Sequence, residues 1–251
     1  MNLTHIIAER PNKTIYRDGD KMMKVFSEDY SKAEVLNEAL NTARVEETGL
    51  NIPKLQAVTM VDGKWAIVSD FIEGKTLQEL MDENPDQLEA YLNRFVELQM
   101  EVLRHSSPLL NDLNMKLQKR ISASGLEATN RYDLHCRLDA MHGHHKLCHG
   151  DFNPSNIIIT PDDTAYIIDW AHAAQGNASA DVARTYLLFW LDGKKNVAEA
   201  YMDLYCKKSD TAKQYVQKWI PIVAAAQLAN SKVSAEEKAL LMRWADVVEY
   251  V

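Results

Sequence analysis

Three oxygen-bearing side chains lie within nineteen residues of one another in the middle of the sequence. Asp151 is followed five residues later by Asn156, and Asp169 comes thirteen residues after that. Carboxylate and amide oxygens are hard ligands that suit Mg²⁺, which fills its remaining positions with water and phosphate oxygens. We expect one acid to bind a metal and the other to remain free to act on a substrate proton.

The stretch between Asn156 and Asp169 predicts a β-hairpin, because two apolar runs flank a Pro-Asp-Asp turn. A two-residue turn at Asp162-Asp163 would pair residues whose numbers sum to 325. Asn156 would then lie directly opposite Asp169. The sequence therefore predicts a metal pair at one end of this hairpin.

The first third of the chain predicts strands around one helix. Asp18-Gly19 and Asp62-Gly63 are flanked by β-prone residues, and an Asp-Gly pair tolerates the positive φ angles of a tight hairpin turn. Between them, residues 31–47 show helical spacing, with Ser31 as a plausible N-cap and Gly49 as a stop. We therefore expect a hairpin, a helix and a second hairpin.

Long helical patterns dominate the rest of the chain, with one short β segment around 156–168. They fall at about 85–105, 126–142, 180–205, 209–229 and 234–249. This order predicts an α+β protein with a small β-rich lobe and a larger helical lobe that share a cleft. We place the N-terminal lobe at residues 1–73 and the C-terminal lobe at 74–251, with the joint near residues 70–74.

Composition excludes some classes of protein and names none. The chain is 46% hydrophobic and 25% charged, and no run of residues is apolar enough for a membrane span, so we expect a cytoplasmic protein. Its three cysteines form no CxxC pair. The formal charge of −8 argues against a nucleic-acid partner and fits weakly with a cationic substrate.

The pattern His149-x-Asp151-x-x-x-x-Asn156, followed by Ile-Ile-Asp169-Trp170, resembles the aminoglycoside phosphotransferase, choline kinase and fructosamine kinase superfamily. The resemblance implies a bilobal protein-kinase-like fold and transfer of phosphate from ATP, with Mg²⁺, to a hydroxyl of a small molecule. It implies that Asp151 is the base or orienting group, and that Asn156 and Asp169 bind magnesium. His149 would hold the catalytic loop in place.

The same resemblance implies a strand lysine that contacts the nucleotide phosphates and pairs with a helical glutamate. Lys24 lies in an apolar β-prone run, and Glu38 lies in the middle of the following helix. We assign this pair to Lys24 and Glu38. Lys21 and Glu34 remain the alternatives, and Glu34 also suits a helix cap.

Residues 65–77 resemble the strand and hinge that hold adenine through backbone groups. The candidate contacts are Ser69, Asp70, Phe71 and Ile72. A strand that runs into a helix cap is the structural alternative. The position of this stretch between Lys24 and Asp151 favours the hinge.

Two further residues receive roles from the resemblance. Asp181 would accept hydrogen bonds that brace the catalytic loop, and Trp170 would line the acceptor pocket, although a core position is the alternative.

Residues 8–14 contain no glycine where a phosphate loop is expected, so Asn12, Lys13 or Thr14 would have to assist backbone amides there.

The identity of the acceptor stays open at this point. Amino alcohols, aminoglycosides and sugar-like compounds all fit the resemblance. A protein kinase-like enzyme and a nucleotide-binding pseudokinase or scaffold are the alternative functions. The sequence also leaves open the choice between ATP and GTP and the oligomeric state.

Overall fold

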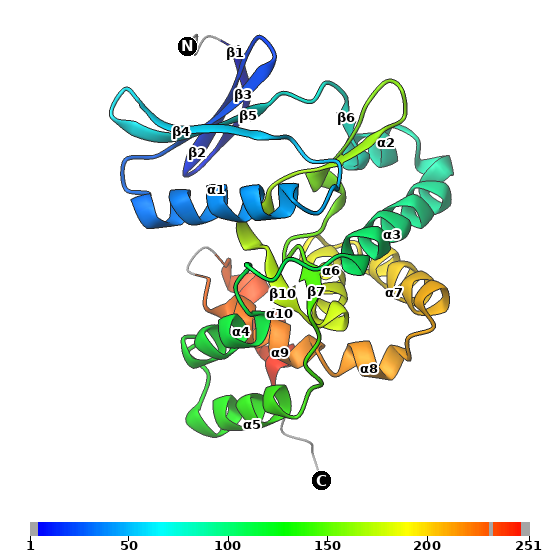
Figure 1. Cartoon of the computed structure of the whole chain (residues 1–251). Helices are drawn as coiled ribbons and strands as arrows, with labels where there is room; N and C mark the ends of the chain where they lie inside the picture. The colour runs from blue at the N-terminus through cyan, green and yellow to red at the C-terminus, as the bar shows by residue number, and fades with distance from the viewer. Residues whose placement is uncertain (1–4, 231–232, 247–251) are drawn as a thin grey trace. The chain divides into compact units, whose positions relative to one another are not determined.

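A computed structural model describes residues 5–230 and 233–246. It has a β-rich part and a helical part, which confirms the expected α+β class (Figure 1). The chain divides into two compact units, and each is described by itself. Unit 1 comprises Met1–Leu88 and Pro154–His172, and unit 2 comprises Glu89–Asn153 and Ala173–Val251.

A five-stranded antiparallel sheet forms the larger part of unit 1, with strand order β1-β2-β3-β5-β4. The strands are β1 (His5–Arg10), β2 (Lys13–Asp18), β3 (Lys21–Phe26), β4 (Leu55–Val61) and β5 (Lys64–Asp70). Helix α1 (Lys32–Glu46) lies along one face of this sheet (Figure 1). Phe26, Val35, Ala39 and Ile67 form the buried core between sheet and helix.

Both expected hairpins are present, and one turn is shifted by a residue. Asp62 and Gly63 form the β4–β5 turn with φ angles of 49° and 79°, as an Asp-Gly turn requires. In the β2–β3 hairpin, Asp18 pairs with Lys21, so Gly19 and Asp20 form the turn. Gly19 supplies the positive φ angle there.

Helix α1 begins and ends as the sequence predicts. The Ser31 side chain accepts a hydrogen bond from the Glu34 N–H, and Gly49 follows the helix with a φ of 79°. Its buried side is less apolar than expected. Leu36 and Leu40 are 43% and 47% exposed, whereas Glu38 is buried, because the helix turns this carboxylate toward the sheet.

A second, smaller sheet draws a distant part of the chain into unit 1. Its strands are β6 (Lys75–Thr76), β8 (Ile157–Ile159) and β9 (Ala165–Ile167), in the order β6-β8-β9. Helix α2 (Leu77–Glu83) follows β6, and short 3₁₀ turns lie at Pro85–Gln87, Pro154–Asn156 and Trp170–His172. The compact units therefore differ from a single boundary at residue 73, because pairing of β6 with β8 holds residues 154–172 in unit 1.

The register expected for the β8–β9 hairpin is wrong by one residue. Ile157 pairs with Ile167, so paired numbers sum to 324, and the Ile168 N–H donates to the carbonyl oxygen of Asn156. The cause is a three-residue loop, with Asp163 in the left-handed region at φ 65°. Asn156 therefore does not lie directly opposite Asp169.

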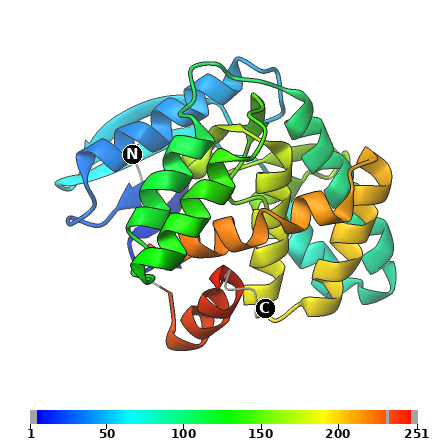
Figure 2. The same cartoon turned by 90° about the horizontal axis from the view of Figure 1, so that it is seen from below.

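Unit 2 is helical around a small two-stranded sheet, β7 (Lys146–Cys148) with β10 (Ala174–Gly176). Helix α9 (Ile220–Leu228) is buried along most of its length, and α4, α6 and α10 pack against it (Figure 2). The helices of this unit are α3 (Leu88–Arg104), α4 (Leu113–Ser122), α5 (Ala128–Asp139), α6 (Ala178–Leu191), α7 (Lys195–Ser209), α8 (Lys213–Gln217), α9 and α10 (Ala235–Ala245).

Two of the expected long helices are each a pair of shorter ones. The segment 180–205 breaks between α6 and α7 at Gly193, whose φ of 74° cannot continue a helix. The segment 209–229 divides into α8 and α9 because Pro221 suits the first turn of a new helix. The end of the expected helix at 247–249 lies outside the described residues. None of the helices in the described ranges is long and apolar enough to cross a membrane.

Candidate active site

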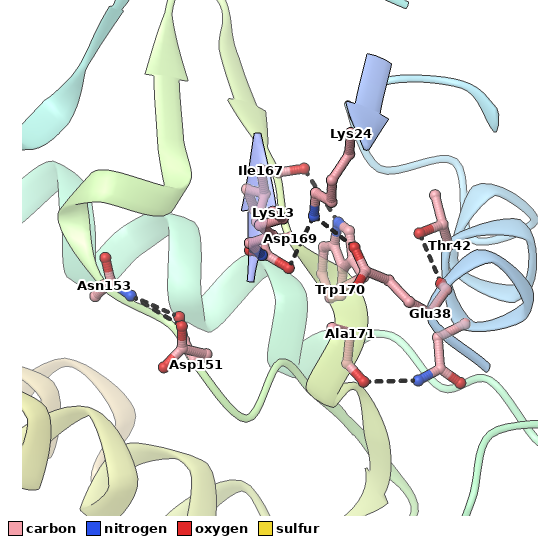
Figure 3. Close-up of polar contacts among 11 residues, drawn as sticks. Lys13, Lys24, Glu38, Thr42, Asp151, Asn153, Ile167, Asp169, Trp170 and Ala171 are labelled. Atoms are coloured by element: carbon pink, nitrogen blue, oxygen red, sulfur yellow. Dashed lines mark hydrogen bonds and ion pairs between the residues drawn. The ribbon is translucent and has the colours of Figure 1, made fainter. Parts of the chain in front are cut away.

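The structure pairs Lys24 with Glu38, and not with Glu34. Lys24 lies in the middle of β3, and its Nζ atom is 2.5 Å from Glu38 Oε1 on α1 (Figure 3). The two side chains are 8% and 7% exposed, so this ion pair is almost fully removed from water. A buried ion pair of this kind fixes both side chains in one geometry, because separating them would leave an uncompensated charge.

Asp169 joins this pair as a second carboxylate. Its Oδ1 atom is 3.4 Å from Lys24 Nζ, and its Oδ2 atom is 3.2 Å from Nζ of Lys13 on β2 (Figure 3). The backbone of Asp169 is left-handed, with a φ of 63°, which an aspartate tolerates better than most residues. Unit 1 therefore gathers two lysines and two carboxylates at one place.

The charge of Lys24 is stabilised strongly. Burial alone would lower the pKa of this ammonium, but the negative charges of Asp169 and Glu38, and hydrogen bonds to both, outweigh burial and raise the pKa above its ordinary value. Lys24 is therefore a permanent cation at every physiological pH. Such a charge is suited to phosphate oxygens.

Lys13 was predicted in a loop, but the structure places it in strand β2. It was one of three possible helpers in a glycine-free loop, yet Pro11-Asn12 is only the turn between β1 and β2. Lys13 pairs with Phe26 across the strands, on the same face of the sheet as Lys24. Alternation along β2 and β3 is the signal that could have selected it.

The donor set near Asp169 fits a magnesium ion bound together with phosphates. Asn156 immediately precedes β8 and Asp169 follows β9, so both flank the same end of the hairpin. Their oxygens are hard ligands, and Mg²⁺ needs few of them when phosphates and water complete its shell. No three His, Cys, Asp or Glu side chains gather as a metal cluster in residues 5–230 and 233–246. These residues therefore suit a magnesium ion whose ligands are shared between the protein, the phosphates and water.

The expected hinge has two of its backbone donors already occupied. The Asp70 N–H donates to the Lys54 carbonyl oxygen at 3.1 Å, and the Phe71 N–H donates to the Asp20 carbonyl oxygen at 2.8 Å. Arg17 also lies over the Phe71 ring, 3.9 Å from its centroid. If this stretch holds adenine, the N–H groups of Asp70 and Phe71 cannot supply the donor while these bonds are intact.

The catalytic segment predicted at 149–153 belongs to unit 2 and is held by local contacts. The Asp151 N–H donates to His149 Nδ1 at 3.2 Å. The Asn153 side chain donates to the Asp151 carbonyl oxygen at 2.9 Å (Figure 3). His149 is fully buried, with its ring edge-on to Phe152. The Asp151 side chain is 30% exposed, so it is the accessible carboxylate of this segment.

A buried polar network fixes the backbone on both sides of Asp151. Asp181 Oδ1 accepts a hydrogen bond from the Gly150 N–H at 2.7 Å, and Thr185 Oγ1 donates to the Phe152 carbonyl oxygen at 2.9 Å. Gln99 connects these two residues, because its Nε2 atom donates to Asp181 Oδ2 and to Thr185 Oγ1. Burial raises the pKa of Asp181, and the bonds from Gly150 and Gln99 oppose that rise.

Gln99 and Thr185 were not predicted as site residues. Gln99 lies on α3 and is 0% exposed, and its Oε1 atom accepts a hydrogen bond from the Tyr201 hydroxyl. A buried glutamine inside an amphipathic helix needs partners for its amide group, and this need is the signal that the sequence carried. The partners themselves come from α6 and α7, far along the chain.

Arg184 is a second residue that the sequence did not assign. Its Nη2 atom lies 3.8 Å from Asp151 Oδ1, and its Nε atom donates to the Gly150 carbonyl oxygen at 3.4 Å. Arg184 lies one turn after Asp181 on α6, so one helix supports the segment through both residues.

The Trp170 ring is not exposed as the lining of a pocket would be. It is 2% exposed, and its indole N–H donates to the Ile167 carbonyl oxygen at 3.1 Å. The expectation that it lines the acceptor pocket is not supported, because a buried and hydrogen-bonded indole packs as a core residue.

Comparison with known proteins gives the family and the fold. The chain is similar in structure to aminoglycoside phosphotransferase APH(4)-Ia, with 16% identity, a TM-score of 0.72 and coverage of 96% of this chain and 90% of that one. An aminoglycoside-3'-phosphotransferase of type VIII is also similar, with 14% identity, a TM-score of 0.65 and coverage of 91% of this chain and 93% of that one. Choline kinase LicA from Streptococcus pneumoniae is similar with 15% identity, a TM-score of 0.66 and coverage of 96% of this chain and 92% of that one. No curated protein matches the chain.

Some of these solved structures hold nucleotides, and one also holds hygromycin B. One APH(4)-Ia structure is a ternary complex with ADP and hygromycin B, and LicA is described in complex with AMP. The family model of the phosphotransferase enzyme family matches residues 10–217, which is most of the chain. The chain therefore belongs to the phosphotransferase enzyme family.

Proposed function

We propose that this protein transfers the γ-phosphoryl group of ATP to a hydroxyl group of a small molecule. The observation that carries the proposal is the cluster in unit 1 in which the buried pair Lys24–Glu38 meets the partly buried side chains of Asp169 and Lys13. Two fixed cations beside a carboxylate suit a triphosphate with its metal. The accessible carboxylate of Asp151 adds a proton acceptor.

Each of the two lobes predicted from the sequence has its own part in this proposal, with the boundary at residue 73. Residues 1–73 bind the nucleotide: Lys24 and Lys13 contact phosphate oxygens, and backbone groups among Ser69–Ile72 hold adenine. Residues 74–251 bind the acceptor and supply Asp151. Mg²⁺ held by Asn156 and Asp169 would neutralise charge on the phosphates.

The chemical step needs one new bond and one proton acceptor. The acceptor oxygen attacks the γ-phosphorus as the bond to the β-γ bridging oxygen breaks, and ADP leaves with that oxygen. The hydroxyl proton passes to the Asp151 carboxylate. Positioning and electrostatic stabilisation supply most of the acceleration in such a reaction, and the network around Gly150 and Phe152 keeps Asp151 in one place.

Two variants separate binding from chemistry. Lys24→Met is expected to abolish the rise in melting temperature that ATP and Mg²⁺ give the wild-type protein. Asp151→Asn is expected to keep this rise and to lose turnover by about 100- to 10,000-fold, which is the range for a lost general base. Lys21→Met is the matched control, because Lys21 is an exposed lysine on the same strand as Lys24.

The outcomes also decide between this proposal and its rivals. Phosphorylation of protein substrates without any small-molecule acceptor would favour a protein kinase. ATP binding without any turnover in the wild type would favour a pseudokinase. Absence of a melting-temperature rise with ATP and Mg²⁺ would contradict nucleotide binding altogether.

A further inference from the structure

Three cationic side chains gather near the Asp151 segment, all within unit 2. Lys116 and Arg120 lie four residues apart on α4, so they share one face of that helix. Arg184 comes from α6, and its guanidinium bridges the Gly150 carbonyl oxygen and the Asp151 carboxylate. Helix α4 packs against α9 and β10, and α6 packs against α9 and β7, which brings the two helices to the same region.

The three cations influence one another electrostatically. Burial lowers the pKa of Lys116 to about 8, and the positive charges of Arg120 and Arg184 lower it further than burial alone would. Burial also lowers the pKa of Arg184 and of Arg120, and Arg120 adds to the effect on Arg184. Like charges that act on one another in a partly buried place disfavour the charged form of each.

Carboxylates on the surrounding elements act on these cations. Asp151 acts on Arg184, Asp181 acts on Lys116 and Arg184, and Cys148 on β7 is a thiol whose pKa is raised by burial. Asp181 is already committed to the Gly150 N–H and to Gln99. Asp151 is the carboxylate that contacts Arg184 directly, at 3.8 Å.

One guanidinium nitrogen points directly to a missing partner. In the part of the chain that the structure describes, Arg184 Nη1 is buried and has no hydrogen-bond partner. Arg120 differs, because its Nε atom donates to the Ala226 carbonyl oxygen at 2.8 Å and so is anchored at the end of α9. A buried donor without a partner costs about 1–3 kcal/mol. Carboxylate and phosphate oxygens are the partners that a guanidinium fits best.

We propose that the acceptor of this kinase carries an anionic group, a carboxylate or a phosphate, which Lys116, Arg120 and Arg184 bind while Asp151 receives the hydroxyl. This inference rests on the proposed function, and it selects among the acceptors that function leaves open. A hydroxy acid or a phosphorylated polyol satisfies these cations. Amino alcohols and aminoglycosides are repelled by them, whatever the net charge of the whole chain.

The first test measures binding of small anions to the full-length protein. Melting temperature is recorded with saturating ADP and Mg²⁺, which fill the nucleotide site, and then with added glycerate, glycerol 3-phosphate, glycerol or choline. At least one anion is expected to raise the melting temperature, with neutral glycerol and cationic choline giving smaller shifts. Glycerate and glycerol 3-phosphate separate a carboxylate from a phosphate. A larger rise with choline, or no rise with either anion, overturns the proposal.

Variants connect that response to the cluster. Arg184→Gln and Lys116→Met are each expected to weaken anion binding about 10- to 100-fold, the value of one or two hydrogen bonds to a charged group. Lys119→Met is the matched control, because Lys119 is exposed on the same helix. Lys116→Met removes a half-buried charge whose pKa is lowered by burial, so it should fold at least as well as the wild type. Equal anion binding in this variant and the control contradicts the proposal.

Turnover distinguishes failure of this inference from failure of the proposed function. ATP consumption is measured with the same four compounds and with gluconate, glucose 6-phosphate and glucosamine. Consumption that depends on Asp151 but prefers glucosamine or choline supports the kinase and overturns the anionic acceptor. Anion binding without any ATP-dependent shift in melting temperature supports the cationic site and contradicts the kinase.

Discussion

In unit 1, the buried ammonium of Lys24 lies between Glu38 and Asp169, and Lys13 brings the set to two cations and two anions. In unit 2, Lys116, Arg120 and Arg184 face Asp151 and Asp181, and one guanidinium nitrogen has no partner among the described residues. The first cluster is complete without a ligand. The second leaves a buried Arg184 donor for which the described residues offer no partner.

This difference separates what the fold needs from what a ligand brings. Matched charges can be held in the absence of a ligand, so the cluster around Lys24 is preorganised. A buried donor without a partner costs stability and is retained where an incoming acceptor satisfies it. The two units therefore make different demands when they are mutated.

The largest effect on stability is expected from breaking the matched set. Lys24→Met leaves the buried Glu38 carboxylate without its partner, so the free energy of unfolding should fall by about 3–5 kcal/mol. Denaturant unfolding measures this change, with Lys21→Met as the control. The double variant Lys24→Met/Glu38→Leu should recover most of the loss. A cost below about 1 kcal/mol for Lys24→Met would show that the cluster is not tightly coupled.

An intermediate effect is expected from Gln99, which joins the supports of the Asp151 segment. Gln99→Leu removes the amide that links Asp181, Thr185 and Tyr201. The buried groups left behind should cost about 1–3 kcal/mol of stability.

Turnover distinguishes positioning by Gln99 from a purely structural role. The kcat value should fall while the KM for ATP stays unchanged, because the loss loosens Asp151 and leaves unit 1 intact. Glu97→Gln, an exposed change on the same helix, should cost at most about 1 kcal/mol. Unchanged kcat in a folded Gln99→Leu protein would remove the positioning role.

The smallest effect on stability concerns Lys116 in unit 2 and has the opposite sign. The pKa of Lys116 is about 8 in the folded protein against an ordinary 10.5, so between these pH values the unfolded chain holds a proton that the folded protein has released. The wild-type free energy of unfolding therefore rises with pH in this window, relative to Lys116→Met.

At pH 7, the charged lysine is the penalised form. Lys116→Met should therefore be more stable than the wild type by about 1–2 kcal/mol. Unfolding curves of the two proteins from pH 7 to 10.5 give the difference directly. A variant less stable than the wild type at pH 7, with no narrowing of the gap at higher pH, would show that Lys116 is not under electrostatic strain.

Local patterns in the sequence were sufficient for the parts of the site that depend on neighbours in the chain. The Ser31 cap fixed the phase of α1 and so put Glu38 within reach of Lys24. The spacing from Asp151 to Asp169 selected the family. The β8–β9 register failed because a three-residue loop and a two-residue loop differ only in the conformation of Asp163.

Contacts between elements that are distant in the chain could not be predicted from local sequence patterns. Helix α4 was not predicted from the sequence. The signal was present, because Leu113, Leu117 and Ile121 recur every four residues after the Asp112 cap. Even with α4 in hand, the meeting of Lys116 with Arg184 depends on how α4 and α6 pack around α9. No local pattern encodes that packing.

The most direct test of the account is ATP-dependent phosphorylation of a small hydroxyl compound by the wild-type protein and by Asp151→Asn. Mass spectrometry of the acceptor detects the added phosphoryl group. The account predicts product with the wild type, loss of product by at least about 100-fold in Asp151→Asn, and an undiminished ATP-dependent rise in melting temperature. Full product formation by Asp151→Asn would contradict the central claim.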